Sequence, residues 1–268
     1  MIKIRECKFG DKKDIDEISS LTWEDHDYLS GVFESWVRDG NFFVAVDNNK
    51  VIGTAKITLL PDKTGWLEGL RVHPDWRGKG IGRKLNDFTI NLARDMRKSG
   101  KIDTIEFSTY FLNKGSLHMT LKSGFKVVKR FFILYRKRDD TIKKPQKIQL
   151  SINYLKEYRD YLPVGWHFIK KTENGYKHLK KMCNVYSTGK YKFYQAGHEE
   201  TFVLLNGSKK AVNDYIPYLN LLSGNTDTID IMFPEEWQDK IPIFKENGYF
   251  LWEEPEEPNI YVLRDYSE

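Results

Sequence analysis

The chain has 268 residues, a formal net charge of +5 and an apolar content of 40%, and 14% of all residues are aromatic. This composition supports one large or two small packed domains and contains no apolar run of the roughly 18 to 20 residues that a membrane span needs. The first residues lack the apolar core of a signal peptide. The only cysteines, Cys7 and Cys183, lie far apart, which predicts a reducing cytoplasm and no disulfide framework.

Basic residues are concentrated in the first half of the chain. Residues 1–140 hold 26 basic and 20 acidic side chains, whereas the remainder holds 17 and 18. A basic first half suits a polyanionic cofactor. We expect no nucleic-acid partner, because no basic stripe is interleaved with aromatic residues, and no metal, because no Cys/His cluster has ligand spacing.

Apolar periodicity predicts alternating strands and helices over the first half of the chain. We expect strands over residues 1–7, 42–46, 51–60, 66–72, 102–108, 126–129 and 131–137. We expect helices over residues 11–21 and 29–38, from about residue 81 to Ser99-Gly100, and over 113–123.

The segment from Trp66 to Leu85 is the most informative part of this series. It reads as a strand that ends at His73-Pro74, then a turn, a glycine-rich loop and an amphipathic helix. A glycine-rich loop at a helix N-terminus presents bare backbone N–H groups, which bind phosphate groups.

Two common phosphate-binding loops are excluded by spacing. A P-loop needs a serine or threonine after Gly-Lys, and the dinucleotide fingerprint needs G-x-G-x-x-G. The run Arg77-Gly78-Lys79-Gly80-Ile81-Gly82 instead resembles the R/Q-x-x-G-x-G/A loop of the GNAT acyltransferases, which grips the pyrophosphate of acetyl-CoA. The preceding run Leu70–Pro74 resembles the fourth strand and turn of that family. The order of elements over residues 1–138 is also that of a GNAT domain.

The resemblance implies a GNAT acyl-CoA N-acyltransferase fold, which is an α+β fold with a mixed, largely antiparallel central sheet flanked by helices. It also implies acetyl-CoA as cofactor, with its pantetheine arm along the fourth strand and its pyrophosphate on the loop amides. The cofactor-binding residues so implied are Leu70, Arg71, Val72, Arg77, Gly78, Lys79, Gly80, Ile81, Gly82, Arg83 and Asn113. A helix cap is an equally good interpretation of Asn113.

An amine acceptor must lose a proton before it attacks a thioester, since alkyl amines have pKa values near ~10. By resemblance to the family, Glu68 is the first candidate for the base and Glu106 the second; a structural ion pair is the alternative for each. The family usually has a tyrosine as general acid where this chain has Thr120. A threonine is a poor acid, though it can position a water, and Tyr110 and His118 are possible substitutes.

The run Trp23–Tyr28 is acidic and aromatic. The resemblance implies that this segment lines the acceptor site, with Trp23, Asp25, Asp27 and Tyr28 as substrate-binding residues. A solvated loop between two helices is the alternative interpretation.

The second half of the chain suggests a degenerate repeat of the first. Thr104-Ile-Glu-Phe precedes Gly124-Phe125 by 20 residues, and Thr228-Ile-Asp-Ile precedes Gly248-Tyr249 by the same 20. We therefore predict a GNAT domain over 1–138, a linker over 139–149 and a second, GNAT-like α/β domain over 150–268, which has no R-x-x-G-x-G loop. Chance similarity is the alternative. In this half we expect helices over 155–161, 176–182 and 209–222, and strands over 165–169 and 201–205.

The resemblance implies an N-acetyltransferase that moves an acetyl group from acetyl-CoA to a primary amine by direct attack, and the cysteine usage predicts that it is cytoplasmic. The acceptor is a small molecule or a peptide, with no membrane partner, and a homodimer is possible. The alternatives are a non-catalytic acyl-CoA-binding or regulatory protein, or a GNAT that transfers a different acyl group.

Overall fold

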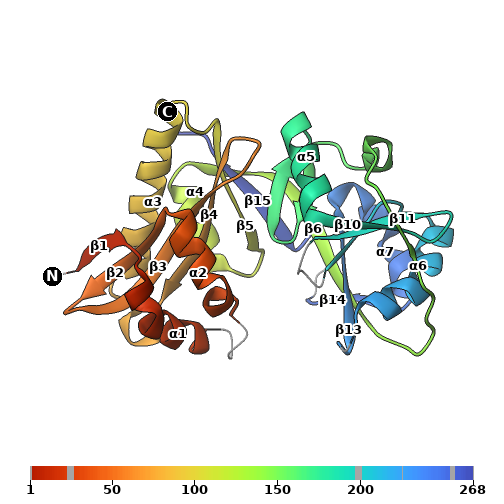
Figure 1. Ribbon diagram of the computed structural model, residues 1–268, viewed down its shortest axis with the longest axis horizontal. Coiled ribbons are helices and arrows are strands. Elements are labelled where there is room, and N and C mark those ends of the chain that lie inside the picture. Colours follow the sequence, from red (N-terminus) through yellow and green to blue (C-terminus); the bar gives the residue numbers. More distant parts are fainter. Residues whose placement is uncertain (1, 23–26, 197–200, 225, 254–256, 268) are drawn as a thin grey trace. The chain divides into compact units, whose positions relative to one another are not determined.

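The structure is a computed structural model that describes residues 2–22, 27–196, 201–224, 226–253 and 257–267. It divides into two compact units, Met1–Phe107 and Ser108–Glu268, and each is described by itself (Figure 1). No helix in the described ranges is both long and apolar enough to cross a bilayer.

The first unit is built on a sheet with strand order β1-β2-β3-β4-β5. Neighbours from β1 to β4 are antiparallel, whereas β5 runs parallel to β4. The strands are β1 (Lys3–Glu6), β2 (Phe42–Asp47), β3 (Lys50–Leu59), β4 (Thr64–Val72) and β5 (Thr104–Tyr110). Each lies within a few residues of its predicted range.

Two apolar clusters place helices against strands of this sheet. One cluster joins α1 (Lys12–Ser20) and α2 (Leu29–Asp39) to residues of β2 and β3. The other joins the start of α3 (Ile81–Lys98) to alternate residues of the same strands, with Leu70 and Val72 of β4 packed against it. Because successive side chains of a strand point to opposite faces, α3 covers one face and α1 with α2 the other.

A bulge interrupts the pairing of β3 with β4. Thr54 faces Arg71 and Lys56 faces Glu68, so Gly69 and Leu70 together stand opposite one residue of β3. Gly69 has a φ of +64°, and a Cβ there would come within 2.5 Å of the Trp36 ring, so only glycine fits. The described pairs of β4 with β5 end at Trp66, which leaves the later part of β4 outside that ladder.

The second unit is organised around one long strand, β6 (Phe125–Lys137). The sequence predicted two strands, over 126–129 and 131–137, and this was wrong because the chain stays extended through Arg130. One edge of β6 pairs with β13 (Thr228–Pro234), while the other pairs first with β15 (Ile260–Asp265) and then with β14 (Tyr249–Leu251).

Further strands extend the sheet beyond β13 in the order β12-β11-β10-β7. These are β12 (Phe202–Leu204), β11 (Lys192–Ala196), β10 (Cys183–Ser187) and β7 (Gln146–Ile148), and a separate hairpin comprises β8 (Tyr161–Val164) and β9 (His167–Lys170). The helices are α4 (Lys114–Lys122), α5 (Glu173–Met182), α6 (Lys209–Leu222) and α7 (Ile241–Glu246). The core of this unit gathers buried side chains of β6, β13, α6 and α7.

The structure differs from the prediction over residues 155–161. Of residues 155–161, which were predicted as a helix, Leu155 ends a 3-10 turn, Tyr161 begins β8, and the residues between them are in neither helix nor strand. Leu155 and Tyr158 are both buried, as in an amphipathic helix, but the Tyr158 hydroxyl donates to the Leu204 carbonyl and fixes the turn instead. Part of the segment 139–149, which we predicted as a linker, forms β7 and pairs with β10; the domain boundaries themselves stay a prediction.

Candidate active site

The glycine-rich loop joins β4 to α3 and precedes helix-start N–H groups that have no acceptor within the helix. Gly78 and Gly80 both have a φ of +75°, a left-handed conformation that favours glycine, and Gly80 is the N-cap of α3. A Cβ at either position would meet no heavy atom of the described chain within 4 Å. The first-turn amides of Ile81, Gly82 and Arg83 have no intrahelical acceptor, so they can bind an anion in this open space.

The basic side chains of the loop are engaged with backbone carbonyls beside it. Arg77 Nε donates to the Val72 carbonyl at 3.2 Å, and Lys79 Nζ donates to the Asp75 carbonyl at 2.9 Å. Lys79 also lies 4.7 Å above the Trp76 ring. The backbone amides are therefore the donors that the loop itself presents, with the two cations contributing charge nearby.

A buried histidine fixes the turn before the loop. The Asp75 N–H donates to His73 Nδ1 at 3.3 Å, so Nε2 carries the proton and donates to Glu17 at 3.1 Å. Glu17 also accepts from Lys50, and its bonds to Lys50 and His73 lower the pKa of the Glu17 carboxyl. Sequence reasoning used His73 only as the end of a strand and missed this role, because Glu17 lies on a distant helix.

The Leu70 and Val72 carbonyls of β4 point away from β3. The His73 N–H donates to the Ile52 carbonyl of β3, so the Val72 carbonyl, which belongs to the same peptide unit, points away from β3. The Leu70 carbonyl lies two residues earlier in the strand and therefore points in the same direction as that of Val72. Both carbonyls accept from guanidinium groups, Leu70 from Arg71 Nη1 at 3.1 Å and Val72 from Arg77 Nε. A carbonyl has two lone pairs, so each can accept a further hydrogen bond.

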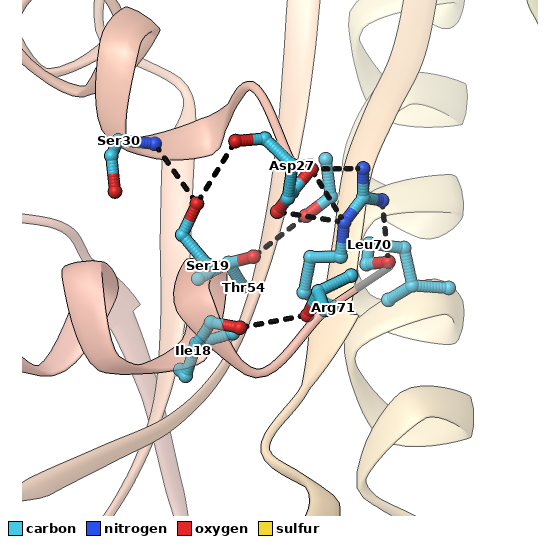
Figure 2. A network of polar contacts seen from close by, with 9 residues as sticks. Ile18, Ser19, Asp27, Ser30, Thr54, Leu70 and Arg71 are labelled. Atoms are coloured by element: carbon cyan, nitrogen blue, oxygen red, sulfur yellow. Dashed lines mark hydrogen bonds and ion pairs between the residues drawn. The ribbon is translucent and has the colours of Figure 1, made fainter. Parts of the chain in front are cut away.

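Arg71 forms a buried ion pair with Asp27, which follows α1 in the chain (Figure 2). Arg71 Nη2 lies 2.9 Å from Asp27 Oδ1, and the two side chains are 12% and 0% exposed. Ser19 Oγ donates to the Asp27 carbonyl at 3.2 Å and accepts from the Ser30 N–H at 3.3 Å. The Asp27 carboxylate, predicted to attract a cationic acceptor, is thus already balanced by a guanidinium.

Tyr28 covers the other side of this guanidinium. Its ring centroid lies 5.4 Å from Arg71 Cζ and 5.9 Å from the ring of Trp36. Although 45% of Tyr28 is exposed, desolvation of the hydroxyl raises its pKa to about 12, so it is protonated at neutral pH. Trp23 and Asp25, the other predicted acceptor-binding residues, lie outside the described residues.

The two candidate bases have different environments. Glu68 is half-buried, accepts a hydrogen bond from the Thr58 hydroxyl and lies opposite Lys56 in the ladder. Glu106 is fully buried and stands beside Trp66 in the parallel pair of β4 with β5. Of the two, only Glu68 exposes part of its surface to an incoming amine.

Asn113 and Thr120 belong to the second unit and both serve α4. Asn113 Oδ1 accepts from the Ser116 N–H at 3.3 Å, which is an N-cap. The Thr120 hydroxyl donates to the Ser116 carbonyl at 2.6 Å and the residue is 3% exposed. Burial raises the pKa of Tyr110 to about 12, with Glu253 adding to the shift.

Comparison with known proteins identifies the family of the first half. Residues 12–125 match the model of the acetyltransferase (GNAT) family. The first half belongs to the GNAT family. Its matched range includes the glycine loop, β4 and both candidate bases, and the predicted α+β GNAT fold is confirmed.

Two curated proteins are similar over part of the chain. Histidine N-acetyltransferases of Oreochromis niloticus and Xenopus tropicalis are each 32% identical over 97 residues, which is 34% of this chain. The match covers 29% of the first relative and 30% of the second, so the chain aligns with less than a third of their length.

Solved structures resemble the whole chain. A proposed acetyltransferase from Thermoplasma acidophilum has a TM-score of 0.67 at 18% identity, with 98% of each chain covered. A GCN5-related N-acetyltransferase from Sphaerobacter thermophilus has a TM-score of 0.64 at 10% identity, covering 98% of this chain and 94% of that one. At these identities the likeness shows the fold, and it supports a GNAT-like second half as well as the first.

Proposed function

We propose that this protein is an N-acetyltransferase that transfers an acetyl group from acetyl-CoA to a primary amine. The observation that carries the proposal is the glycine loop, which presents helix-start amides in open space directly after the outward-facing carbonyls of β4. The loop amides fit a pyrophosphate, and the Leu70 and Val72 carbonyls fit the amide N–H groups of a pantetheine arm. Acetyl-CoA supplies the activated acyl group as a thioester.

Glu68 is the proposed base of the reaction. It takes a proton from the ammonium form of the acceptor, directly or through a water, and the neutral amine then attacks the thioester carbonyl carbon. A C–N bond forms, the C–S bond breaks, and the thiolate is a fair leaving group because thiol pKa values lie near ~8.5. The second proton on nitrogen passes to the thiolate, directly or through water, which gives the neutral amide and the free thiol, and the proton on Glu68 goes to solvent. Thr120 supplies no proton in this scheme, since its hydroxyl is committed to the α4 backbone.

The proposed acceptor is a small amine, and free histidine is the first compound to test because both curated relatives bear that activity in their names. Tyr28 provides a partly exposed aromatic surface on the α1–α2 side of β4 that can pack against such an acceptor. The Arg71 charge beneath it is balanced by Asp27, so this surface has no excess negative charge from that pair.

The test is turnover with the purified full chain. We expect release of free CoA thiol with acetyl-CoA and histidine or another amine from a panel of amino acids, polyamines and peptide N-termini. Binding of acetyl-CoA without thiol release for any amine would contradict the enzyme proposal. Longer acyl-CoA donors in the same assay show whether the enzyme prefers a different acyl group to acetyl.

A non-catalytic acyl-CoA-binding protein is the second candidate, and the Thr120 environment is the observation that favours it. That position has no acid, and its hydroxyl is bonded within its own helix. The thiol-release assay separates the two proposals. We also propose domain boundaries at residues 138 and 149, a cytoplasmic location and a homodimer.

A further inference from the structure

The second unit contains a cavity of about 570 Å³ that none of the proposed acetyl-transfer residues lines. Its walls come from β6, β15, the β8–β9 hairpin and the start of α5, all within Ser108–Glu268. The lining residues are Val127, Val128, Arg159, Asp160, Tyr161, Lys170, Lys171, Thr172, Arg264 and Tyr266. Four of them are cationic, and among these described lining residues Asp160 is the one carboxylate.

A bulge in β6 forms part of this cavity. Val262 of β15 faces Lys129, and the next residue, Leu263, faces Val127, so Val128 is an extra residue in β6. In a regular strand two successive side chains point to opposite faces, but here both valines line the same space. The bulge therefore adds two apolar side chains to a cavity whose lining also includes four cations.

Two of the cationic side chains donate hydrogen bonds to neutral oxygen atoms. Arg264 Nη2 donates to the Tyr161 hydroxyl at 2.6 Å, and Tyr161 is the ladder partner of Lys170. Lys171 Nζ donates to the carbonyls of Leu155 and Tyr158 at 2.9 and 2.7 Å. Four cations held around one space, with a single carboxylate in the lining, create a positive potential that concentrates anions.

The start of α5 adds to this potential. Thr172 lines the cavity and caps the helix, since its Oγ1 accepts from the Gly175 N–H at 3.1 Å. A helix N-terminus carries a partial positive charge, so α5 supports anion binding in the same direction as the side chains.

We propose that this cavity binds a small organic anion, with a phosphate or carboxylate group held by Arg159, Lys170 and Arg264. The non-polar part of the ligand lies against Val127, Val128 and the Tyr161 and Tyr266 rings. Its lining shares no residue with the acetyl-CoA site proposed at the glycine loop, so it offers a place for an effector or for a second substrate group.

The experiment measures binding of adenosine monophosphate, inorganic phosphate and citrate to the full chain by calorimetry and thermal shift at constant ionic strength. We expect saturable binding of at least one of them, and the phosphate and citrate arms distinguish the two anion chemistries. Arg159 is exposed and Arg159→Gln is therefore compatible with folding. Combined with Lys170→Gln, it raises the Kd at least about 10-fold, a change of ~1.4 kcal/mol.

Lys177→Gln is the matched control, because Lys177 is a cation of α5 that pairs with Glu173 and does not line the cavity. It leaves the Kd unchanged. The proposal is overturned if the control and the cavity variants raise the Kd of the anion equally. It is also overturned if no probe shows saturable binding. Loss of the same binding in Gly80→Val also overturns it, since the anion would then occupy the glycine loop. Normal anion binding in a chain that shows no thiol release would leave this proposal standing while the acetyltransferase proposal fails.

Discussion

The guanidinium of Arg71 binds the carboxylate of Asp27 from two nitrogen atoms, Nη2 at 2.9 Å and Nε at 3.2 Å. A third nitrogen, Nη1, donates to the carbonyl of Leu70, which lies in the β4 bulge. One side chain thus joins the segment between α1 and α2 to the strand proposed to bind pantetheine (Figure 2). We expect the two regions to respond together when either is altered.

Removing the charge of Asp27 tests this relationship. Asp27→Asn leaves a guanidinium that is only 12% exposed without its carboxylate, and losing one member of a buried pair costs about 3 kcal/mol. Glu34→Gln is the control, because the Arg38–Glu34 pair is well exposed and is worth at most about 1 kcal/mol. Denaturant unfolding measures the free energy of unfolding of both variants. Equal losses of stability would contradict a larger contribution from the Asp27–Arg71 pair. The double variant with Arg71→Gln is expected to lose less than the sum of the single variants.

Gly80 and Gly100 form a matched pair for testing the loop. Both have a φ of +75° and open space where a Cβ would stand, but Gly80 precedes α3 and Gly100 follows it. Valine at either position brings a similar backbone strain of about 1–2 kcal/mol. We expect Gly80→Val to weaken acetyl-CoA binding at least about 10-fold and Gly100→Val to leave it unchanged. Unchanged affinity in Gly80→Val contradicts the cofactor assignment.

Glu68→Gln is expected to lower kcat by a factor of about 10² to 10⁴, with little change in the KM for acetyl-CoA. The difference in kcat between the variant and the unmodified enzyme should become smaller as the pH approaches the acceptor pKa near ~10, because the amine then loses its proton to solvent. Initial rates across pH test this. Glu106→Gln is the comparison, and a larger pH-dependent loss there would transfer the role of base to Glu106.

Thr120→Val is expected to change kcat by no more than about 2-fold, since removing a helix back-bond need not disturb a reaction in which its hydroxyl takes no part. The measurement is the thiol-release rate at saturating substrates. A larger drop at unchanged stability would show that the hydroxyl acts in the reaction, for example by positioning a water.

Acid stability depends on Asp11. Burial raises the pKa of this carboxyl, but the Arg5 guanidinium and the Lys8 amide outweigh burial and hold the pKa below its usual value. A depressed pKa in the folded state stabilises the protein above the unfolded value of about 3.9, and this contribution is lost as the pH falls through the folded pKa. Unfolding of Asp11→Asn should therefore depend less on pH below about pH 5 than unfolding of the unmodified chain. Asp16→Asn, in an exposed pair with Lys12, should retain the full dependence.

The sequence was sufficient to predict the first unit because each element there carries its own local signal. The apolar stripe of α3 predicts a helix, and the glycines at 78 and 80 predict where it starts. Both signals are local and need no other segment of the chain. The β4 bulge was not predicted, since it depends on Gly69 meeting Trp36 of α2. The Asp27–Arg71 pair was missed for the same reason, as its partners lie 44 positions apart.

The second unit was predicted less well because its elements depend on distant partners. Leu155 and Tyr158 have helical spacing, yet Leu155 ends a 3-10 turn and Tyr158 lies in the segment before β8, where its hydroxyl donates to the Leu204 carbonyl. Nothing in the short run 146–148 indicates a strand until β10 lies beside it. The site residues stay predictions, because only binding and rate measurements test them.

The pairing of β6 determines when its sheet can be completed during synthesis of the chain. The Asn259 side chain accepts from the Ile133 N–H and donates to the Ile133 carbonyl, closing the edge between β14 and β15 across 126 positions of chain. At ~5–20 residues per second a ribosome takes on the order of ten seconds to add that length. During this interval the apolar edge around Phe131 and Ile133 has no partner from β14 or β15. A newly made chain therefore presents an open strand edge to other nascent chains and to chaperones before it can complete its own sheet.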